Sequence, residues 1–235
     1  MWRDAAVHVV VPAYREERLI PRMLRRVPAF VDRIVVVDDG SDDGTAEAAR
    51  SVADPRIDVV RHARNRGVGA AIVTGYRRAF AHGASVAVVM AGDDQMHPDD
   101  LEAVIAPIVR GDADYVKGNR MIHADARRMP LLRRVAGRAL SFATRRATGL
   151  RVGDTQCGYT ALGAPAAAQL PLESLWPSYG YPNDLLGLLA GRGLRVREAP
   201  VRPVYADEAS GVRPWHVLTI LGVLARRRLI ERRYR

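Results

Sequence analysis

Short runs of β-branched residues alternate with longer stretches of helical spacing over the first half of the chain. The apolar runs cover residues 7–11, 34–37, 57–60 and 86–89. Between them, residues 19–27 and 70–80 show the length and the apolar spacing of helices. Strands that are apolar throughout are typical of a parallel sheet covered by helices on both faces. The pattern therefore predicts an α/β fold that begins as βαβαβα.

The second half of the chain follows a different pattern. After residues 114–118, a long basic stretch with helical periodicity leads into an irregular section, rich in Gly, Tyr and Pro, near residues 154–182. A short helix is expected from Asn183 and a strand near residues 194–204. No repeat or linker divides the chain, which predicts one domain over residues 1–210.

Positive charge is concentrated in two segments. The 36 Lys and Arg residues outnumber 26 Asp and Glu, which gives a formal charge of +10. Eight arginines and no acid lie in residues 127–151, and six arginines with one acid lie in residues 226–235, so the remainder is slightly acidic. Two such patches favour an anionic partner, which is nucleic acid, an acidic membrane surface or a phosphorylated substrate. The second patch belongs to a predicted basic amphipathic helix over residues 211–235.

Composition excludes several classes of protein. The only cysteine, Cys157, rules out a disulfide framework and a cysteine-based zinc site, and it fits a reducing compartment. The N-terminus has no apolar segment of the kind found in signal peptides. The apolar run over residues 215–225 is shorter than the about 20 residues that span a bilayer. We therefore expect a soluble or peripheral protein.

Polar motifs follow the predicted strands at their carboxyl ends, where open α/β sheets bind ligands. VPAYREE follows the first strand, DDGSDDGT the second and AGDDQMHP the fourth. Asp38 and Asp39 end a buried strand, where carboxylates are costly unless they meet donors or a cation, and a nucleoside offers such donors. The alternative for this motif is a turn in which Ser41 or Asp43 caps the following helix.

Asp93 and Gln95 are two oxygen ligands spaced two residues apart in an extended loop, where both side chains can face one side. Hard oxygen ligands suit Mg²⁺ or Mn²⁺. The alternative is a solvated acidic loop that precedes a helix capped by Asp99 or Asp100. The histidines are scattered along the chain and suggest no metal cluster.

Together, the segments VVVPAYREE, VVVDDGSDDGT, ARNRGVGAAIVTGY and MAGDDQMHPDDL resemble the family 2 glycosyltransferases with the GT-A fold. VKGNRM and GDTQCGYTAL narrow the resemblance to the dolichyl- or polyprenyl-phosphate sugar synthases, over residues 7–204. It implies a Rossmann-like fold with a mainly parallel central sheet and helices on both faces. Residues 1–118 would form the nucleotide-sugar half, and residues 119–210 the acceptor half.

The resemblance also implies roles for individual residues of the nucleotide-sugar half. The expected nucleotide-sugar-binding residues are Pro12, Tyr14, Glu16, Asp38, Asp39, Asn65, Gly67 and Asp93. Close helix packing explains the glycines near Gly67 equally well. Asp93, as a catalytic residue, and Gln95 would hold Mg²⁺ or Mn²⁺, which bridges the donor's phosphates. The family's acidic triplet usually begins with Asp, where this chain has Ala91.

In the acceptor half, the resemblance implies that Arg120 and Arg133 grip the acceptor phosphate, since a guanidinium fork suits that group. Gln156 is the third residue expected to bind the acceptor phosphate, and it belongs to an element that lines the space between donor and acceptor. Asp184 lies where inverting members often carry a general base and is the second expected catalytic residue. A hydroxyl acceptor needs such a base, whereas an ionised lipid phosphate does not, and Asp184 would then be a positioning group or a helix cap.

These features predict an inverting glycosyltransferase that moves a hexose from a nucleotide diphosphate sugar to polyprenyl phosphate. The enzyme would be cytoplasmic and peripheral at the inner face of the membrane, with the anionic membrane surface as a partner. One alternative acceptor is a hydroxyl of a saccharide or secondary metabolite. Another alternative is a catalytically silent anion- or RNA-binding protein. Nucleic acid is not an expected partner, because residues 127–151 offer only Phe142 for base stacking; self-association is left open.

Overall fold

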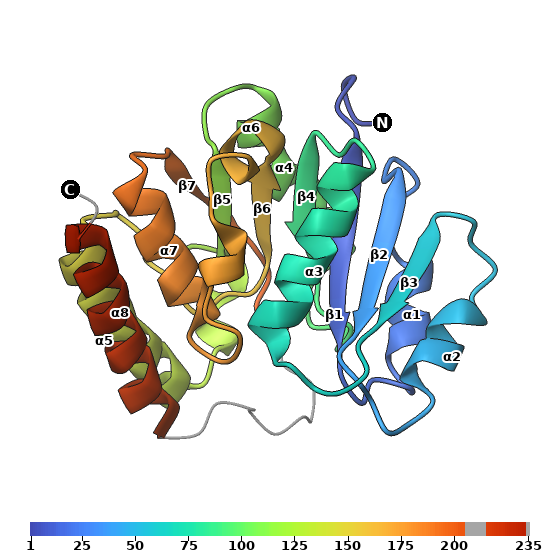
Figure 1. Ribbon diagram of the computed structural model, residues 1–235, viewed down its shortest axis with the longest axis horizontal. Helices are drawn as coiled ribbons and strands as arrows, with labels where there is room; N and C mark the ends of the chain where they lie inside the picture. The colour runs from blue at the N-terminus through green and yellow to red at the C-terminus, as the bar shows by residue number, and fades with distance from the viewer. Residues whose placement is uncertain (205–214, 234–235) are drawn as a thin grey trace.

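A seven-stranded sheet forms the centre of the part of the chain that the computed structural model describes, residues 1–204 and 215–233 (Figure 1). The strands follow the order β3-β2-β1-β4-β6-β5-β7 across the sheet. Their bounds are β1 Val7–Ala13, β2 Arg33–Asp38, β3 Ile57–Arg61, β4 Val86–Val89, β5 Tyr115–Asn119, β6 Thr160–Gly163 and β7 Val196–Pro200. The first 89 residues of the chain form the four neighbouring strands β3, β2, β1 and β4.

One strand is reversed relative to its neighbours. β6 pairs antiparallel with both β4 and β5, whereas the pairs β1–β2, β1–β4, β2–β3 and β5–β7 are parallel. Residues that precede β6 therefore lie at the same edge of the sheet as the residues that follow β4 and β5. This edge collects the ends of strands from both halves of the chain, as expected for ligand binding in an open α/β sheet.

Helices cover both faces of the sheet. The α-helices are α1 Ile20–Arg25, α2 Thr45–Arg50, α3 Val68–Ala81, α4 Leu101–Val109, α5 Leu131–Thr148, α6 Ala164–Ala167, α7 Tyr181–Gly191 and α8 Trp215–Arg233; the short 3₁₀ helices are Pro98–Asp100, Ala124–Arg128 and Leu172–Ser174. Side chains of α1, α2 and α4 fill the core on one face, and those of α3, α6 and α7 fill it on the other. The mainly parallel α/β architecture predicted from the sequence is confirmed.

A third small cluster lies outside the two main cores. Leu140 of α5 packs against Ile220 and Leu224 of α8. Both helices also contact α7, and Figure 1 shows them side by side at the edge beyond β7. The predicted basic helix over residues 211–235 corresponds to α8, although residues 211–214 and 234–235 lie outside the described residues.

The predicted elements agree with the observed ones where the chain is periodic. β4 has the predicted bounds, and the other three N-terminal strands extend the predicted runs by one or two residues. The short helix expected from Asn183 begins at Tyr181, with Pro182 in its first turn. The sequence pattern missed β6, because Thr160–Gly163 is a four-residue segment that contains alanine and glycine within an irregular section.

Candidate active site

A cleft of about 620 Å³ opens at the edge of the sheet where the two halves of the chain meet. Most of the residues predicted for the site line it: Pro12, Tyr14, Glu16, Asp39, Asn65, Gly67, Asp93, Gln95, Arg120 and Gln156. Asp38, Arg133 and Asp184 are not among the lining residues. The carboxylates of the cleft come from the N-terminal half, and its arginines, Arg120 and Arg202, come from the C-terminal half.

Asp39 is held rigidly at the end of β2. Its Oδ1 accepts a hydrogen bond from the N–H of Arg66 at 2.9 Å, and its Oδ2 accepts one from the N–H of Gly67 at 2.7 Å. His62 Nδ1 lies 2.7 Å from Oδ1, while Nε2 of the same ring contacts Thr74. A carboxylate has about four acceptor positions. These described contacts occupy three of them, which leaves one on Oδ2 for a ligand.

Gly67 introduces α3 with a left-handed backbone, at φ 94°. A Cβ at this position would lie 2.4 Å from the carbonyl oxygen of Pro177, and a Cβ at Gly69 would lie 2.2 Å from that of Trp176. The glycines therefore let α3 pack against the 176–178 loop, as the packing alternative predicts. Asn65 accepts a hydrogen bond from the N–H of Gly67 and lines the cleft beside it.

Asp38 faces away from the cleft, although it neighbours Asp39 in sequence. Its side chain is fully buried, with Oδ1 accepting from the N–H of Ser41 at 2.9 Å and Oδ2 lying 3.2 Å from Nε of Arg61. Successive side chains of a strand point to opposite faces, so only one of the two carboxylates can face the ligand. Asp38 thus stabilises the turn after β2, and the structure separates it from the other residues predicted to bind the nucleotide sugar.

Asp93 and Gln95 both line the cleft directly after β4. Asp93 Oδ1 accepts a hydrogen bond from the N–H of Gln95 at 3.1 Å, which fixes the turn between them. Asp94 has a left-handed backbone, φ 56°, and its carboxylate pairs with Arg22 at 2.9 Å and Arg26 at 2.7 Å. Asp94 therefore points away from the two predicted ligands.

The oxygen set of Asp93 and Gln95 fits a magnesium-type ion. In the described part of the chain, no three His, Cys, Asp or Glu side chains gather to form an all-protein metal cage. Mg²⁺ typically takes only one or two carboxylates and completes its shell with water and substrate phosphates. Two hard oxygen ligands that face a cleft are consistent with such an ion.

Arg120 reaches the cleft from the end of β5 as half of a partly buried ion pair. Its Nε donates to Asp154 Oδ2 at 2.7 Å and its Nη2 donates to Oδ1 at 3.0 Å. Burial alone would raise the pKa of Asp154, but the Arg120 guanidinium outweighs it and lowers the pKa below the usual value. The bidentate pair fixes the guanidinium plane at the cleft wall.

Behind Arg120 lies the only lysine of the chain, Lys117, which is fully buried in β5. Its ammonium donates a hydrogen bond to the carbonyl oxygen of Cys157, a cleft-lining residue. Burial lowers the pKa of Lys117 to about 8. Lys117 therefore supports the 154–158 segment from inside the protein.

Gln156 connects the cleft to α5 and α7. Its amide nitrogen donates to Asn183 Oδ1 at 3.2 Å, and Asn183 donates to Thr144 Oγ1 at 2.7 Å. Arg133, the other predicted phosphate contact, is half-buried on α5 and does not line the cleft. The structure therefore brings Arg120 and Gln156 together but leaves Arg133 apart from them.

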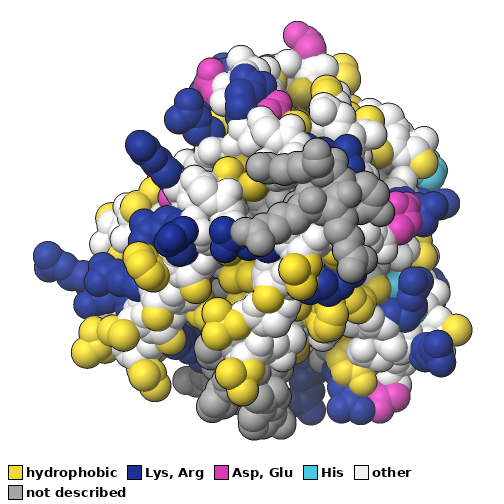
Figure 2. All heavy atoms as spheres, turned by 60° about the vertical axis from the view of Figure 1, so that its left-hand side comes forward, with side chains coloured by type: hydrophobic (Ala, Val, Ile, Leu, Met, Phe, Trp, Pro, Cys, Tyr) yellow, Lys and Arg dark blue, Asp and Glu magenta, His cyan; other side chains and the backbone are white. Residues whose placement is uncertain are grey.

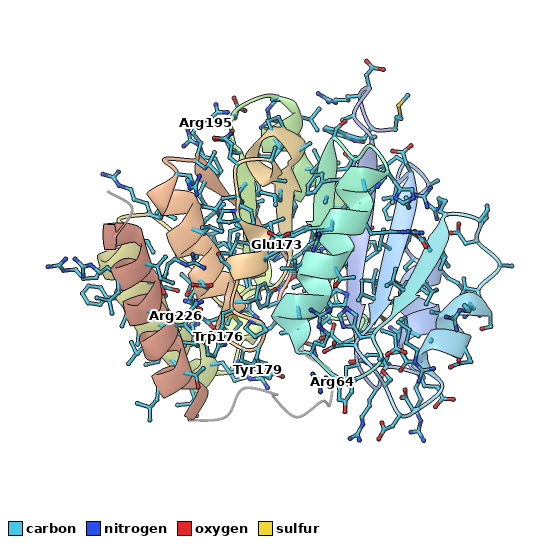
Figure 3. All side chains as sticks on the ribbon, viewed as in Figure 1. Arg64, Glu173, Trp176, Tyr179, Arg195 and Arg226 are labelled. Carbon is cyan, nitrogen blue, oxygen red and sulfur yellow. The ribbon has the colours of Figure 1, made fainter. Side chains whose placement is uncertain are left out.

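Asp184 is sequestered rather than presented to a substrate. Its side chain is fully buried, and Arg227 of α8 donates to Oδ1 at 2.7 Å and to Oδ2 at 2.8 Å. The N–H of Trp176 donates to Oδ2 at 2.8 Å. Arg226 lies 3.8 Å from the same oxygen and stacks over the Trp176 ring, as Figure 3 shows for these two labelled side chains.

Sequence reasoning missed two residues of the site, His62 and Arg202. His62 is one of the scattered histidines for which the sequence suggests no role, yet it lies directly after β3 and contacts Asp39. Arg202 lines the cleft two residues after β7, and it pairs with Asp99 and Asp100, at 3.3 Å each. Both follow the carboxyl end of a strand, which is the rule that located the other motifs.

Solved structures of one enzyme share this fold. Glucosyl-3-phosphoglycerate synthase from Mycobacterium tuberculosis, in complex with UDP, aligns with a TM-score of 0.73 and 21% identity over 96% of this chain and 80% of that chain. Further structures of that enzyme contain Mn²⁺ with UDP-glucose and phosphoglyceric acid, or Mg²⁺ with UDP. The likeness confirms the predicted GT-A fold.

Proteins of similar sequence align with most of this chain. The UDP-N-acetylglucosamine–dolichyl-phosphate N-acetylglucosaminyltransferase of Methanococcus voltae is 29% identical over 87% of this chain and 88% of the relative. The polyprenol monophosphomannose synthase of Mycolicibacterium smegmatis is 30% identical over 82% of this chain and 75% of the relative. The model of the family described as glycosyl transferase family 2 matches residues 8–162. Because this match covers more than half of the 235 residues of the chain, the chain belongs to glycosyl transferase family 2.

Proposed function

We propose that the protein transfers a hexose, with inversion, from a nucleotide diphosphate sugar to polyprenyl phosphate at the cytoplasmic face of the membrane. The relatives carry names that specify dolichyl, undecaprenyl or polyprenol phosphate. The observation that carries the proposal is the division of one continuous cleft, in which the N-terminal half supplies carboxylates and the C-terminal half supplies arginines. Such a division suits a donor whose leaving group needs a cation and an acceptor that is itself an anion.

In the donor part of the cleft, Asp39 is the residue that we assign to the nucleoside. Its open acceptor position on Oδ2 suits a base N–H or a ribose hydroxyl, and its other contacts keep the carboxylate oriented. Tyr14 and Glu16, after β1, form the neighbouring wall. Asn65 and Gly67 bring α3 and its first N–H groups to the same space.

Asp93 and Gln95 would hold Mg²⁺ or Mn²⁺ together with the donor's diphosphate. When bound, the ion neutralises the charge that builds up on the departing nucleoside diphosphate. Asp93 is the catalytic residue in this proposal, because its carboxylate is the only charged member of the pair. The pairing of Asp94 with Arg22 and Arg26 keeps the intervening residue from competing for the ion.

The state of Asp184 supports a phosphate acceptor. A hydroxyl nucleophile must lose a proton to a base, whereas a phosphate monoester oxygen is already ionised at pH 7 and attacks the anomeric carbon directly. In the attack, the bond to the anomeric carbon forms as the bond to the diphosphate breaks. Asp184, which would be the base, is buried and held by Arg227 and the Trp176 N–H.

Arg120 and Gln156 are the acceptor residues in this proposal. Arg120 offers the geometry that suits phosphate, and Asp154 keeps its guanidinium in place. Arg202 is a second cleft cation of the same half. Among the described residues, no helix is both long and apolar enough to cross a membrane.

The decisive experiment is a donor screen with a lipid acceptor. Purified protein is incubated with Mn²⁺, polyprenyl phosphate and either GDP-mannose, UDP-glucose or UDP-N-acetylglucosamine, and the lipid-linked sugar is separated. We expect one donor to give product and the Asp93→Asn variant to give none. If no donor yields a lipid-linked sugar while a soluble hydroxyl acceptor is glycosylated, the acceptor assignment is wrong.

A further inference from the structure

Helix α5 has its apolar face turned outward. The face that packs on the protein carries mostly small and polar residues: besides Leu140, its buried residues are Gly137, Ser141 and Thr144. The opposite face carries large apolar side chains, and Leu132 and Phe142 are 81% and 64% exposed. A helix at a protein surface normally buries its apolar stripe. The reversed arrangement leaves α5 with an apolar face and no protein partner in the described chain.

Helix α8 is apolar on two sides. Ile220, Val223 and Leu224 are buried against the protein. On the other side, Leu218 and Leu229 are 72% and 63% exposed. One apolar face would suffice for packing, so the second one needs another explanation.

The two outward faces lie on the same side of the molecule, because α5 and α8 pack together beyond α7. We call their exposed apolar residues the α5/α8 platform: Leu131, Leu132, Val135, Phe142, Leu218, Leu221 and Leu229. Figure 2, in which this side is turned forward, shows apolar side chains interspersed with arginines. Several large exposed apolar side chains gathered on one side in this way mark an interaction site.

The charge around the platform identifies its partner. Exposed arginines flank it on α5, at Arg138, Arg145 and Arg146, and on α8, at Arg228. Neither α5 nor the 218–230 stretch of α8 contains an acid. Two copies of this chain packed through the platform would bring these arginines together without counter-charges. An anionic lipid surface offers both the apolar layer and the negative charge.

The platform borders the acceptor side of the cleft. Ile220 of α8 is buried and lines the cleft on the inner side of the helix. Tyr179, which is exposed and also lines the cleft, lies between α3 and α8 in Figure 3. A phosphate group that is anchored in a bilayer beneath α8 is therefore close to the cleft wall.

We propose that the α5/α8 platform docks this protein on an anionic bilayer, with its leucines and Phe142 in the acyl boundary and its arginines on lipid phosphates. This deepens the proposed function and rests on it for the acceptor, because docking presents the cleft to a lipid-borne phosphate. The docking itself requires no sugar donor and can be measured separately. It also requires no membrane-spanning helix.

The experiment measures sedimentation of the full chain with vesicles of phosphatidylcholine, with and without phosphatidylglycerol. The test variant combines Leu132→Gln with Phe142→Gln. A second variant, Arg138→Gln, removes one arginine beside the platform. Its matched control is Arg25→Gln, because Arg25 lies on α1 at the far side of the sheet. We expect the wild type to bind only the anionic vesicles. The double variant should bind about a hundredfold more weakly, at about tenfold for each inserted side chain.

Two further measurements separate docking from catalysis. Turnover with a short-chain prenyl phosphate in detergent micelles should be unchanged in the double variant, because both substituted side chains are exposed and outside the cleft. If the wild type makes no product with any donor, the proposed function fails while the vesicle result still decides docking. Docking is overturned if the double variant or Arg138→Gln binds vesicles like the wild type. It is also overturned if the platform proves to be a dimer interface in analytical ultracentrifugation.

Discussion

The ion pair between Asp184 and Arg227 gives the sharpest test of how this enzyme treats its acceptor. Asp184→Asn keeps the shape of the side chain and removes its charge. If the acceptor is a hydroxyl group, this change would remove a general base and lower turnover about 10²- to 10⁴-fold. If the acceptor is a phosphate group, as proposed above, it removes only a structural contact between α7 and α8.

The size of the structural effect follows from the burial of the pair. Asp184 is fully buried, Arg227 is 3% exposed, and the guanidinium meets both carboxylate oxygens. Removing one partner of a buried pair costs about 3–5 kcal/mol of unfolding free energy, because the other charge remains buried. Ser174 also accepts from Arg227, through its carbonyl oxygen at 3.1 Å, which places the cost near the lower limit. A loss of about 3 kcal/mol lowers Tm by about 10 °C in a domain of this size.

Two assays with one matched control decide the question. Thermal unfolding of Asp184→Asn is compared with that of Asp114→Asn, which breaks an exposed pair with Arg195 and should cost less than about 1 kcal/mol. Turnover is then measured at a temperature where Asp184→Asn is fully folded, and kcat should stay within about threefold of the wild type. A folded variant with unchanged KM and a kcat reduced about a hundredfold or more would refute the reasoning and restore Asp184 as the base.

Three further outcomes are expected. Asp93→Asn should abolish the stimulation of nucleotide diphosphate binding by Mn²⁺ in calorimetry, and binding that stays Mn²⁺-dependent would contradict the ligand assignment. Asp39→Asn should weaken nucleotide binding about tenfold even without metal, because the nucleoside donor would lose its charged acceptor and the Gly67 N–H would lose the contact that orients it; unchanged affinity would exclude Asp39 from the pocket. The pKa of Lys117 is about 8 in the folded protein, whereas the usual value of a lysine is 10.5. Between pH 8 and 10.5 the unfolded chain therefore binds more protons than the folded protein. The unfolding free energy of the wild type, measured in urea relative to that of Lys117→Met, should therefore rise by up to about 3 kcal/mol from pH 8 to 10.5. If the difference between the two proteins does not change with pH, Lys117 does not titrate in this range.

The N-terminal half was predictable because its strands are buried on both faces and consist of β-branched residues. Val7–Ala13 and Arg33–Asp38 extend the predicted runs only at their ends. β6 could not be predicted, since Thr160–Gly163 gains its strand conformation from pairing with β4 and β5 rather than from its own sequence. Its reversed direction is likewise a tertiary property.

The position of a motif at a strand end located the site, but not the direction in which each side chain points. Asp38 and Asp39 are equivalent in the motif, and the alternation of the strand sends only Asp39 to the cleft. Asp184 was placed near the site by resemblance, and its partner Arg227 lies 43 residues later. No local pattern could reveal that pairing, because it depends on how α8 packs against α7.

The positions of the strands along the chain also determine which part of the sheet is synthesised first. β3, β2, β1 and β4 come from the first 89 residues, so this parallel subsheet can pair as soon as it leaves the ribosome. α8 is the last helix of the described chain, and it supplies both the counter-charge for Asp184 and the cleft residue Ile220. A nascent chain can thus assemble the edge that carries the proposed nucleotide-sugar residues well before the proposed acceptor wall exists. Completion of the cleft is tied to the arrival of α8.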